Sequence, residues 1–327
     1  MTKLSPLASP SATRAVLEAH GLATKKALGQ NFLINDAILE KIIALSRVNE
    51  DDFVLEVGPG IGTLTIALLK HAGFVVSVER DRDLPAVLAE TLEPWADRFS
   101  LIGKDALDLT KADLADAAER LGAQANAAGA FGDQVVAPAS RSAHPLPNKF
   151  VANLPYAVAA TLVLDYFERF ESLESATVMV QAEVADRMAA KAGTKNYGAY
   201  TVKLSLFAEP AGRFSVSPGN FFPPPRVDSS VLRLKRCTPV DGDGNQLTRE
   251  AVRATCIMAD AAFFNRRKTL ANSCKMYFAG KGEQGTAVAK ALDSLFERAG
   301  IDSRRRGETL TREEFIGLGE GLLDATS

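Results

Sequence analysis

The stretch Phe53-Val-Leu-Glu-Val57, followed at once by Gly58-Pro-Gly-Ile-Gly62, decides the fold of this sequence. The first five residues predict a short buried strand, and helical periodicity resumes from Thr63 to His71. A glycine turn between a strand and a helix lets backbone N–H groups approach a ligand without obstruction by a Cβ atom. The stretch therefore predicts an α/β sheet that binds a nucleotide-like ligand at this turn.

The alternation of strand and helix continues on both sides of this unit. A helix is expected over residues 36–47, with Asn35 or Asp36 as its N-cap. Further strands are expected at residues 74–78, 99–102, 150–152, 176–180, 213–216 and 229–234, and further helices at 84–92, 162–170 and 183–192. Strands that alternate with helices indicate a mostly parallel sheet.

Two changes in composition suggest how the chain is organised. Residues 113–148 shift to Ala, Gly, Pro and small polar residues, which predicts a surface insertion. The turn-forming run at residues 241–245 is a linker signal, and only helices are predicted after it, at 247–264, 287–299 and 311–323. We therefore expect a sheet domain over residues 1–240 and a small helical domain over 245–327.

The composition is that of an ordinary globular protein. The net charge is -2 and the pI about 6.0, so any contact with nucleic acid must be local. The cysteines Cys237, Cys256 and Cys274 contain no C-x-x-C pair, and we expect neither a disulfide framework nor a metal. No run resembles a signal peptide or a membrane span, so the expected compartment is the cytoplasm.

An acidic residue follows the glycine turn at the spacing that a nucleoside requires. Glu79 ends the next strand, nineteen residues after Gly60, where its carboxylate can accept both hydroxyl protons of a ribose. The glycines are not spaced as G-x-G-x-x-G, which disfavours a hydride-transferring enzyme. Asp105, after the third strand, could bind the adenine amine of the cofactor, although a lone Asp at such a place is more often a helix or turn cap.

The segment Asn153-Leu-Pro-Tyr156 follows a strand and therefore lies at the same edge of the sheet as the glycine turn. The Asn153 side-chain oxygen can accept a hydrogen bond, and Pro155 makes the turn rigid beside a free carbonyl. Tyr156 offers a flat face to a base. Together these groups could bind an exocyclic amine and direct it at a methyl donor, whereas a turn with a packed tyrosine is the alternative.

Seven motifs, in this order, resemble the ribosomal RNA adenine dimethyltransferase family over nearly the whole chain. They are residues 28–33 (LGQNFL), 56–62 (EVGPGIG), 78–81 (VERD), 105–106 (DA), 153–156 (NLPY), 221–229 (FFPPPRVDS) and 264–270 (FNRRKTL). The resemblance implies a Rossmann-like, S-adenosylmethionine-dependent methyltransferase sheet with a small C-terminal α-helical domain. Only the insertion and the residues before Lys25 depart from the family pattern.

The resemblance also implies roles for individual residues. Cofactor-binding positions would be Asn31, Leu33, Gly58, Gly60, Glu79, Asp105 and Asn153. The catalytic segment would be Asn153, Leu154, Pro155 and Tyr156, with Tyr156 and Phe221 stacking on the flipped adenine. The family dimethylates the N6 amines of two adjacent adenosines near the 3′ end of small-subunit (16S) rRNA.

Two cationic clusters suggest how the RNA is held. They are Arg266, Arg267 and Lys268, and Arg304, Arg305 and Arg306, in a tail with 13 basic and 11 acidic residues. Clustered cations can follow a phosphate backbone even when the average charge is near zero. We expect the helical domain to bind small-subunit rRNA within a pre-30S particle, and we expect a monomer.

Two other functions fit many of the same motifs. A large-subunit rRNA adenine N6-methyltransferase of the antibiotic-resistance type would share the glycine turn and a similar target-base segment, but the Arg266 to Lys268 cluster disfavours it. A non-catalytic RNA-binding factor in ribosome assembly would use the fold only as a platform, and an intact cofactor pocket disfavours it. Cofactor binding separates the enzyme from the assembly factor.

Overall fold

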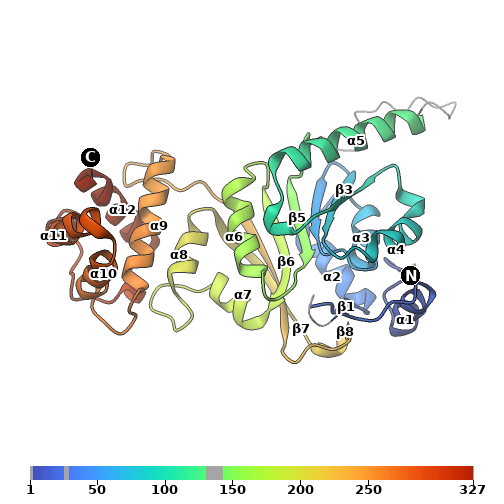
Figure 1. The fold of residues 1–327 in the computed structure, drawn as a ribbon, viewed down its shortest axis with the longest axis horizontal. Helices are drawn as coiled ribbons and strands as arrows, with labels where there is room; N and C mark the ends of the chain where they lie inside the picture. The colour runs from blue at the N-terminus through green and yellow to red at the C-terminus, as the bar shows by residue number, and fades with distance from the viewer. Residues whose placement is uncertain (1–2, 26–28, 130–142, 327) are drawn as a thin grey trace. The chain divides into compact units, whose positions relative to one another are not determined.

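The computed structural model describes residues 3–25, 29–129 and 143–326, which divide into two compact units (Figure 1). The first unit comprises Met1–Ala185 and Pro210–Lys235, and the second comprises Asp186–Glu209 and Arg236–Ser327. Residues 186–209, which the sequence placed with the sheet, belong to the helical unit instead. The reason is packing, because Tyr197 and Val202 are buried in the helical core.

In the described part of the first unit, a seven-stranded sheet has the strand order β4-β3-β2-β5-β6-β9-β7. The strands are β2 (Phe53–Val57), β3 (Phe74–Glu79), β4 (Phe99–Gly103), β5 (Lys149–Asn153), β6 (Ser175–Gln181), β7 (Ala208–Val216) and β9 (Ser229–Arg236). Strands β2 to β6 pair in parallel, and β9 runs antiparallel to β6. The α/β class and the mostly parallel sheet are confirmed.

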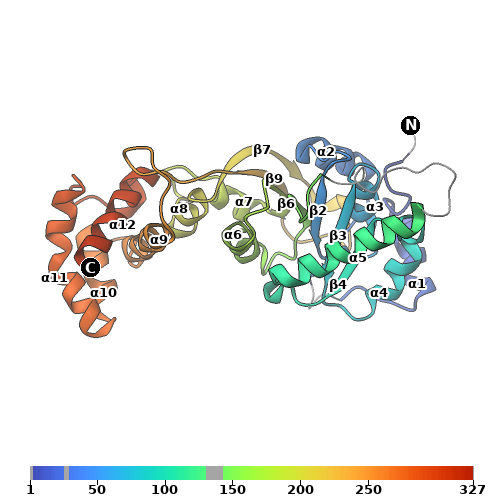
Figure 2. The same ribbon diagram turned by 90° about the horizontal axis from the view of Figure 1, so that it is seen from above.

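Helices cover both faces of this sheet. Helices α2 (Asp36–Ser46), α3 (Thr63–Leu69) and α4 (Leu84–Thr91) pack one face, where their apolar side chains share a core with Val54 and Val75. On the other face, α6 (Ala159–Arg169) places the Tyr166 ring 5.1 Å from that of Phe150. Figure 2 shows α5 and α6 along one side of the sheet and α2 along the other. The strand order runs outward from β2 in both directions, so the connecting helices lie on both faces of the sheet.

Residues 3–25 and 29–33 form an N-terminal arm that lies beside the glycine turn. Helix α1 (Pro10–Ala19) starts at the N-cap Ser9, whose hydroxyl accepts from Ala12 N. Strand β1 (Phe32–Leu33) then pairs antiparallel with β8 (Phe221–Phe222). The sequence patterns did not predict α1, β1 or β8, and the two strands are only two residues long. The β1–β8 pair holds the arm beside the glycine turn.

The first part of the expected insertion is a helix. Residues 113–129 lie in α5 (Lys111–Gly129), whose side chains Leu114, Ala117 and Leu121 are buried. A surface insertion without a helix in it was expected over residues 113–148, and the structure shows that its first part is helical. Residues 130–142 of the expected insertion lie outside the described residues.

The second unit is built mainly from helices. They are α8 (Ala199–Ser205), α9 (Arg249–Phe263), α10 (Leu270–Ala279), α11 (Gly282–Arg298) and α12 (Arg312–Thr326), and α7 (Ala182–Met188) precedes them. Helices α9 and α12 approach closely, since a Cβ atom on Gly319 would lie 2.3 Å from Thr255 Oγ1. The three helices predicted after the linker are confirmed. Within the described ranges, no helix has the length and apolarity that a membrane span requires.

Candidate active site

The glycine turn between β2 and α3 is shaped by three residues in the left-handed region. Gly58, Gly60 and Gly62 have φ angles of 69°, 60° and 91°. At Gly60 a Cβ atom would also lie 2.9 Å from Phe32 Cε1, so a larger side chain would collide with the arm. Glycine at these positions therefore lets the backbone pass close to β1 and leaves its N–H groups open toward the cavity.

Glu79 ends β3 next to this turn, and the residue is 9% exposed. Burial raises its pKa, while hydrogen bonds from the backbone N–H groups of Asp81, Arg80 and Gly60 oppose the rise. The bond from Asp81 N to Oε1 is 2.8 Å long. These donors hold an acceptor at a fixed place beside the glycine turn, as a ribose would require.

The arm is fastened to the turn after Glu79 by a network around Asp81. The carboxylate of Asp81 accepts from Lys25 Nζ at 2.6 Å and from Gln30 Nε2 at 2.8 Å. Lys25 Nζ also contacts Asp83 Oδ2 at 2.5 Å. The side chain of Asp81 is only 4% exposed, whereas that of Lys25 is 38% exposed, so the buried member of this pair is the carboxylate. The network fixes the segment that carries Asn31 and Leu33.

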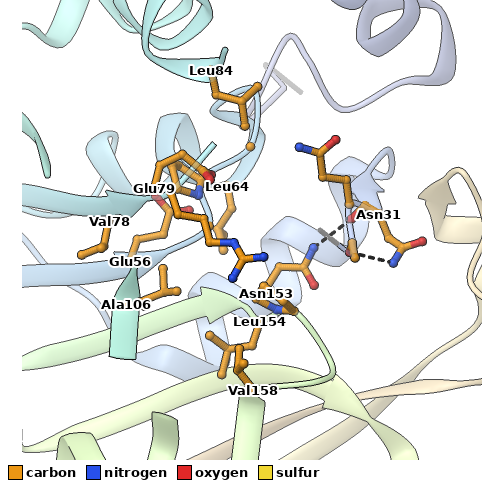
Figure 3. A pocket seen from close by; sticks show the side chains of 18 of the residues that line it. Asn31, Glu56, Leu64, Val78, Glu79, Leu84, Ala106, Asn153, Leu154 and Val158 are labelled. Carbon is orange, nitrogen blue, oxygen red and sulfur yellow. Dashed lines mark hydrogen bonds between the residues drawn. The ribbon is translucent and has the colours of Figure 1, made fainter. Parts of the chain in front are cut away.

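The segment from Asn153 to Tyr156 faces the arm at the end of β5. Asn153 Nδ2 donates to the backbone carbonyl of Asn31 at 3.0 Å, shown as a dashed line in Figure 3. Within the described residues, Asn153 Oδ1 and the Leu154 carbonyl accept no hydrogen bond. The Pro155 carbonyl instead accepts from Val158 N at 3.2 Å. Two acceptors are therefore available, and the second is the carbonyl of Leu154.

The ring of Tyr156 is held through its hydroxyl, which lies 2.6 Å from Ser229 Oγ at the start of β9. Partial burial raises the pKa of this phenol, which keeps it protonated at neutral pH. The hydroxyl is thus used for anchoring, and the ring remains at the cavity. This arrangement suits a stacking surface better than an acid or base.

Asp105 also lines the cavity and has two partners. Its Oδ2 accepts from Arg80 Nη1 at 3.0 Å, and its Oδ1 accepts from Leu107 N at 3.1 Å. The second bond caps a short 3-10 helix at Ala106–Asp108. The turn-capping role considered from the sequence is therefore present, and a ligand amine would share this carboxylate with Arg80.

One cavity of about 380 Å³ brings together ten of the predicted site residues. They are Asn31, Leu33, Gly58, Gly60, Glu79, Asp105, Asn153, Leu154, Pro155 and Tyr156. The cavity lies beyond the carboxyl ends of β2, β3 and β5, where the strand order reverses. Ligands bind at such reversal points in open α/β sheets.

Sequence reasoning missed Glu56, which also lines the cavity. Its Oε2 accepts from Thr65 Oγ1 and Ser77 Oγ, each at 2.8 Å, and the residue is 1% exposed. Burial raises its pKa to about 7 despite these two bonds. A glutamate inside an otherwise apolar strand was the signal that could have identified it.

Phe221 is not among the residues that line the cavity. It is 2% exposed and belongs to the apolar core, where its backbone pairs with Leu33. The structure therefore does not bring Phe221 together with Tyr156 as a second exposed ring. Stacking on a base would require the Phe221 ring to leave this core.

The two cationic clusters lie in the helical unit and are neighbours. Leu270 N donates to the Arg305 carbonyl at 2.7 Å, so the second cluster meets the start of α10, directly after Lys268. Arg305 is bound by Glu314, and Arg266 Nε lies 2.8 Å from Glu308 Oε2.

The six cations of these clusters are therefore not equivalent. Arg304 is exposed but contacts Asp302, whereas Arg267, Lys268 and Arg306 are exposed and form no ion pair with any described residue. Arg305 is the exception, since its side chain is half-buried and holds Glu314 near the start of α12. Arg305 therefore contributes to the stability of the unit, whereas Arg267, Lys268 and Arg306 are exposed and lack an ion pair among the described residues.

Comparison with known proteins gives consistent matches over the whole chain. The family described as "Ribosomal RNA adenine dimethylase" matches residues 21–316. The chain is 39% identical over 323 residues to ribosomal RNA small subunit methyltransferase A of Enterococcus faecalis, with 98% of each chain covered. It is also 39% identical to the protein of that name from Pelotomaculum thermopropionicum, again with 98% of each covered.

A solved structure supports the fold. A dimethyladenosine transferase from Plasmodium falciparum superposes with a TM-score of 0.67 at 22% identity, covering 88% of this chain and 95% of that one. The Rossmann-like methyltransferase fold expected from the sequence is confirmed by this likeness.

Proposed function

The chain belongs to the ribosomal RNA adenine dimethylase family, and from this premise we propose that it dimethylates the N6 amines of two adjacent adenosines near the 3′ end of small-subunit rRNA. The observation that carries the proposal is a single cavity in which Asn153 and Tyr156 lie with the glycine turn and Glu79. The glycine turn and Glu79 fit a nucleoside cofactor, whereas Asn153 and Tyr156 fit a base with an exocyclic amine.

The residues around the glycine turn fit S-adenosylmethionine. Gly58 and Gly60 would lie against its methionine part because neither has a Cβ atom to obstruct it. Glu79 would accept the ribose hydroxyls, and Asp105 would accept the adenine amine. Asn31 and Leu33 would close the pocket from the arm. When bound, the cofactor supplies an electrophilic methyl group.

The two open acceptors would orient the target amine. Adenine N6 is a weak nucleophile because its lone pair is delocalised into the ring. Hydrogen bonds from its protons to Asn153 Oδ1 and the Leu154 carbonyl would favour a more tetrahedral nitrogen. Positioning then supplies much of the remaining rate, without a covalent enzyme intermediate.

The ring of Tyr156 would hold the adenine after it leaves the RNA stack. Its hydroxyl is occupied by Ser229, so the contribution is stacking and not proton transfer. The N6 proton can leave to water after methyl transfer, because the methylated nitrogen is acidic. The site therefore needs no strong base.

The helical unit would bind the RNA backbone within a pre-30S particle. Arg267, Lys268 and Arg306 supply exposed charge without an internal partner among the described residues. Phosphate contacts of this kind position an enzyme without reading sequence. Full-length relatives named for the small subunit favour this substrate over large-subunit rRNA.

The test uses the purified chain, labelled S-adenosylmethionine and small-subunit particles from cells that lack this enzyme. We expect mass spectrometry to detect N6,N6-dimethyladenosine, and primer extension to map it near the rRNA 3′ end. Asn153→Ala should reduce methyl transfer by a larger factor than it reduces cofactor affinity in calorimetry. Label found only in large-subunit RNA would favour the antibiotic-resistance type of enzyme. Particle binding without cofactor binding would favour an assembly factor.

A further inference from the structure

Phe264, at the C-cap of α9, presents an aromatic ring to solvent. It is 58% exposed, more than any other large apolar residue that the structure describes as exposed, and it is the aromatic one among them. Its neighbour Phe263 turns inward and stacks 6.0 Å from Phe315 in the helical core. One helical step of about 100° separates the two rings, so Phe264 points away from the core that Phe263 fills.

The exposed ring is held in place on one edge. Its centroid lies 5.8 Å from that of Tyr277 on α10, in an edge-to-face arrangement. Lys281 Nζ lies 4.8 Å from the Tyr277 centroid. The backbone after the ring is fixed as well, because Asn265 N donates to Ser273 Oγ at 2.9 Å. A ring held in this way loses little entropy when a flat ligand stacks on it.

The surroundings of this ring are cationic. Arg267 and Lys268 follow it within the same turn, and Lys268 N bonds to the Asn265 carbonyl at 3.0 Å. Three carboxylates of the same unit are already paired. Glu308 binds Arg266, Asp302 binds Arg304 and Asp293 binds Lys275. The charge left for a ligand is therefore positive.

We propose that Phe264 stacks on an unpaired base of the RNA while Arg267 and Lys268 contact the adjoining phosphates. The inference rests on the proposed function, since it adds a second base-binding place, remote in sequence from Tyr156. An aromatic face beside cations is the arrangement with which proteins hold single-stranded nucleic acid. An acidic protein partner would use the cations but would gain little from a flat exposed ring.

The test measures binding and methylation of unmethylated small-subunit particles by four forms of the full chain. They are the wild type, Phe264→Ala, Phe264→Trp and the control Val240→Ala, which shortens another exposed apolar side chain of the same unit. We expect Phe264→Ala to weaken particle binding about five-fold or more, with kcat at saturation unchanged. Phe264→Trp should bind at least as well as the wild type, and Val240→Ala should match it.

Two further readouts separate stacking from charge and from misfolding. The slope of log K against log salt should not change in Phe264→Ala, whereas Arg267→Gln should reduce it. Ultraviolet crosslinking followed by mass spectrometry should find a nucleotide attached to Phe264 in the wild-type complex. Unchanged cofactor affinity and melting temperature would show that the variants are folded.

Failure of this inference about Phe264 can be told apart from failure of the proposed function. If the wild type methylates the particles and Phe264→Ala binds them equally well, Phe264 is only an exposed apolar residue and the inference is overturned. Equal loss in Phe264→Ala and Phe264→Trp, or a crosslink to a ribosomal protein instead of RNA, would also overturn it. A wild-type chain that methylates no small-subunit RNA would overturn the proposed function itself.

Discussion

Asn153 Nδ2 donates a hydrogen bond to the backbone carbonyl of Asn31, and the two atoms are 3.0 Å apart. The contact turns the amide nitrogen toward the arm and therefore turns Oδ1 away from it. The arm is in turn fastened to Asp81 through Gln30 and Lys25. The orientation of the proposed catalytic amide thus depends on charges that lie outside the catalytic segment.

Asp81→Asn tests this dependence. We expect methyl transfer in a single turnover to slow about tenfold, on the order of one charged hydrogen bond, because Lys25 loses its buried partner. The matched control is Asp83→Asn, whose carboxylate is 52% exposed and, among the described residues, pairs with Lys25. That variant should stay near the wild-type rate. Equal rates for Asp81→Asn and the wild type would show that the arm needs no such fastening.

The role of the Tyr156 ring is tested by two substitutions that separate ring from hydroxyl. Tyr156→Ala should depress methyl transfer by roughly 1–3 kcal/mol while leaving cofactor affinity nearly unchanged, because only base stacking is lost. Tyr156→Phe keeps the ring and loses the bond to Ser229, so its main effect should be about 1 kcal/mol of stability. The methyl-transfer rate, the cofactor affinity from calorimetry and the free energy of unfolding are measured for both variants. Parallel losses of rate and cofactor affinity in Tyr156→Ala would make Tyr156 a packing residue.

Glu56 predicts a pH dependence of stability. Burial raises its pKa from 4.5 to about 7, so between these values the folded protein binds more protons than the unfolded chain. The free energy of unfolding should therefore fall as the pH rises through this window. The contribution is complete below pH 4.5 and is lost above pH 7, and its size is roughly 3 kcal/mol.

Urea unfolding at pH 5 and pH 8 measures this effect. Glu56→Gln, which keeps an acceptor for Thr65 and Ser77 but does not titrate, should lose less stability between these two pH values than the wild type does. The difference between the two proteins isolates Glu56 from other groups. Identical pH profiles would mean that the carboxyl ionises normally.

The cations of the second cluster should divide into two functional kinds. Replacing Arg304 and Arg306 with Gln should weaken particle binding and lower the salt slope by about one for each phosphate that is no longer neutralised, with cofactor affinity intact. Arg305→Gln should instead lower the melting temperature, because it leaves Glu314 without its cation. If the variant that carries both Arg304→Gln and Arg306→Gln keeps the salt dependence of wild-type particle binding, the RNA is bound by other residues.

Local patterns in the sequence were sufficient for the main elements of the sheet. The run Phe53 to Val57, the following glycines and the helix after them form β2, its turn and α3, because each signal lies within a few residues. The parallel sheet then brought Glu79 and Asn153 to one edge, as expected of strands joined by helices. The order of motifs also sufficed for the family, which the comparisons confirm.

Contacts between distant residues decided what the patterns could not. The pairing of Asp81 with Lys25 and the burial of Phe221 depend on the path of the arm, which no local spacing encodes. Helix α5 was not predicted, because its apolar pattern ends near Leu121 while the helix continues to Gly129. The sequence shows which side chains are present, but tertiary contacts decide which of them are exposed. Within one run of arginines, they paired the half-buried Arg305 with Glu314 and left Arg306 exposed, without an ion pair among the described residues.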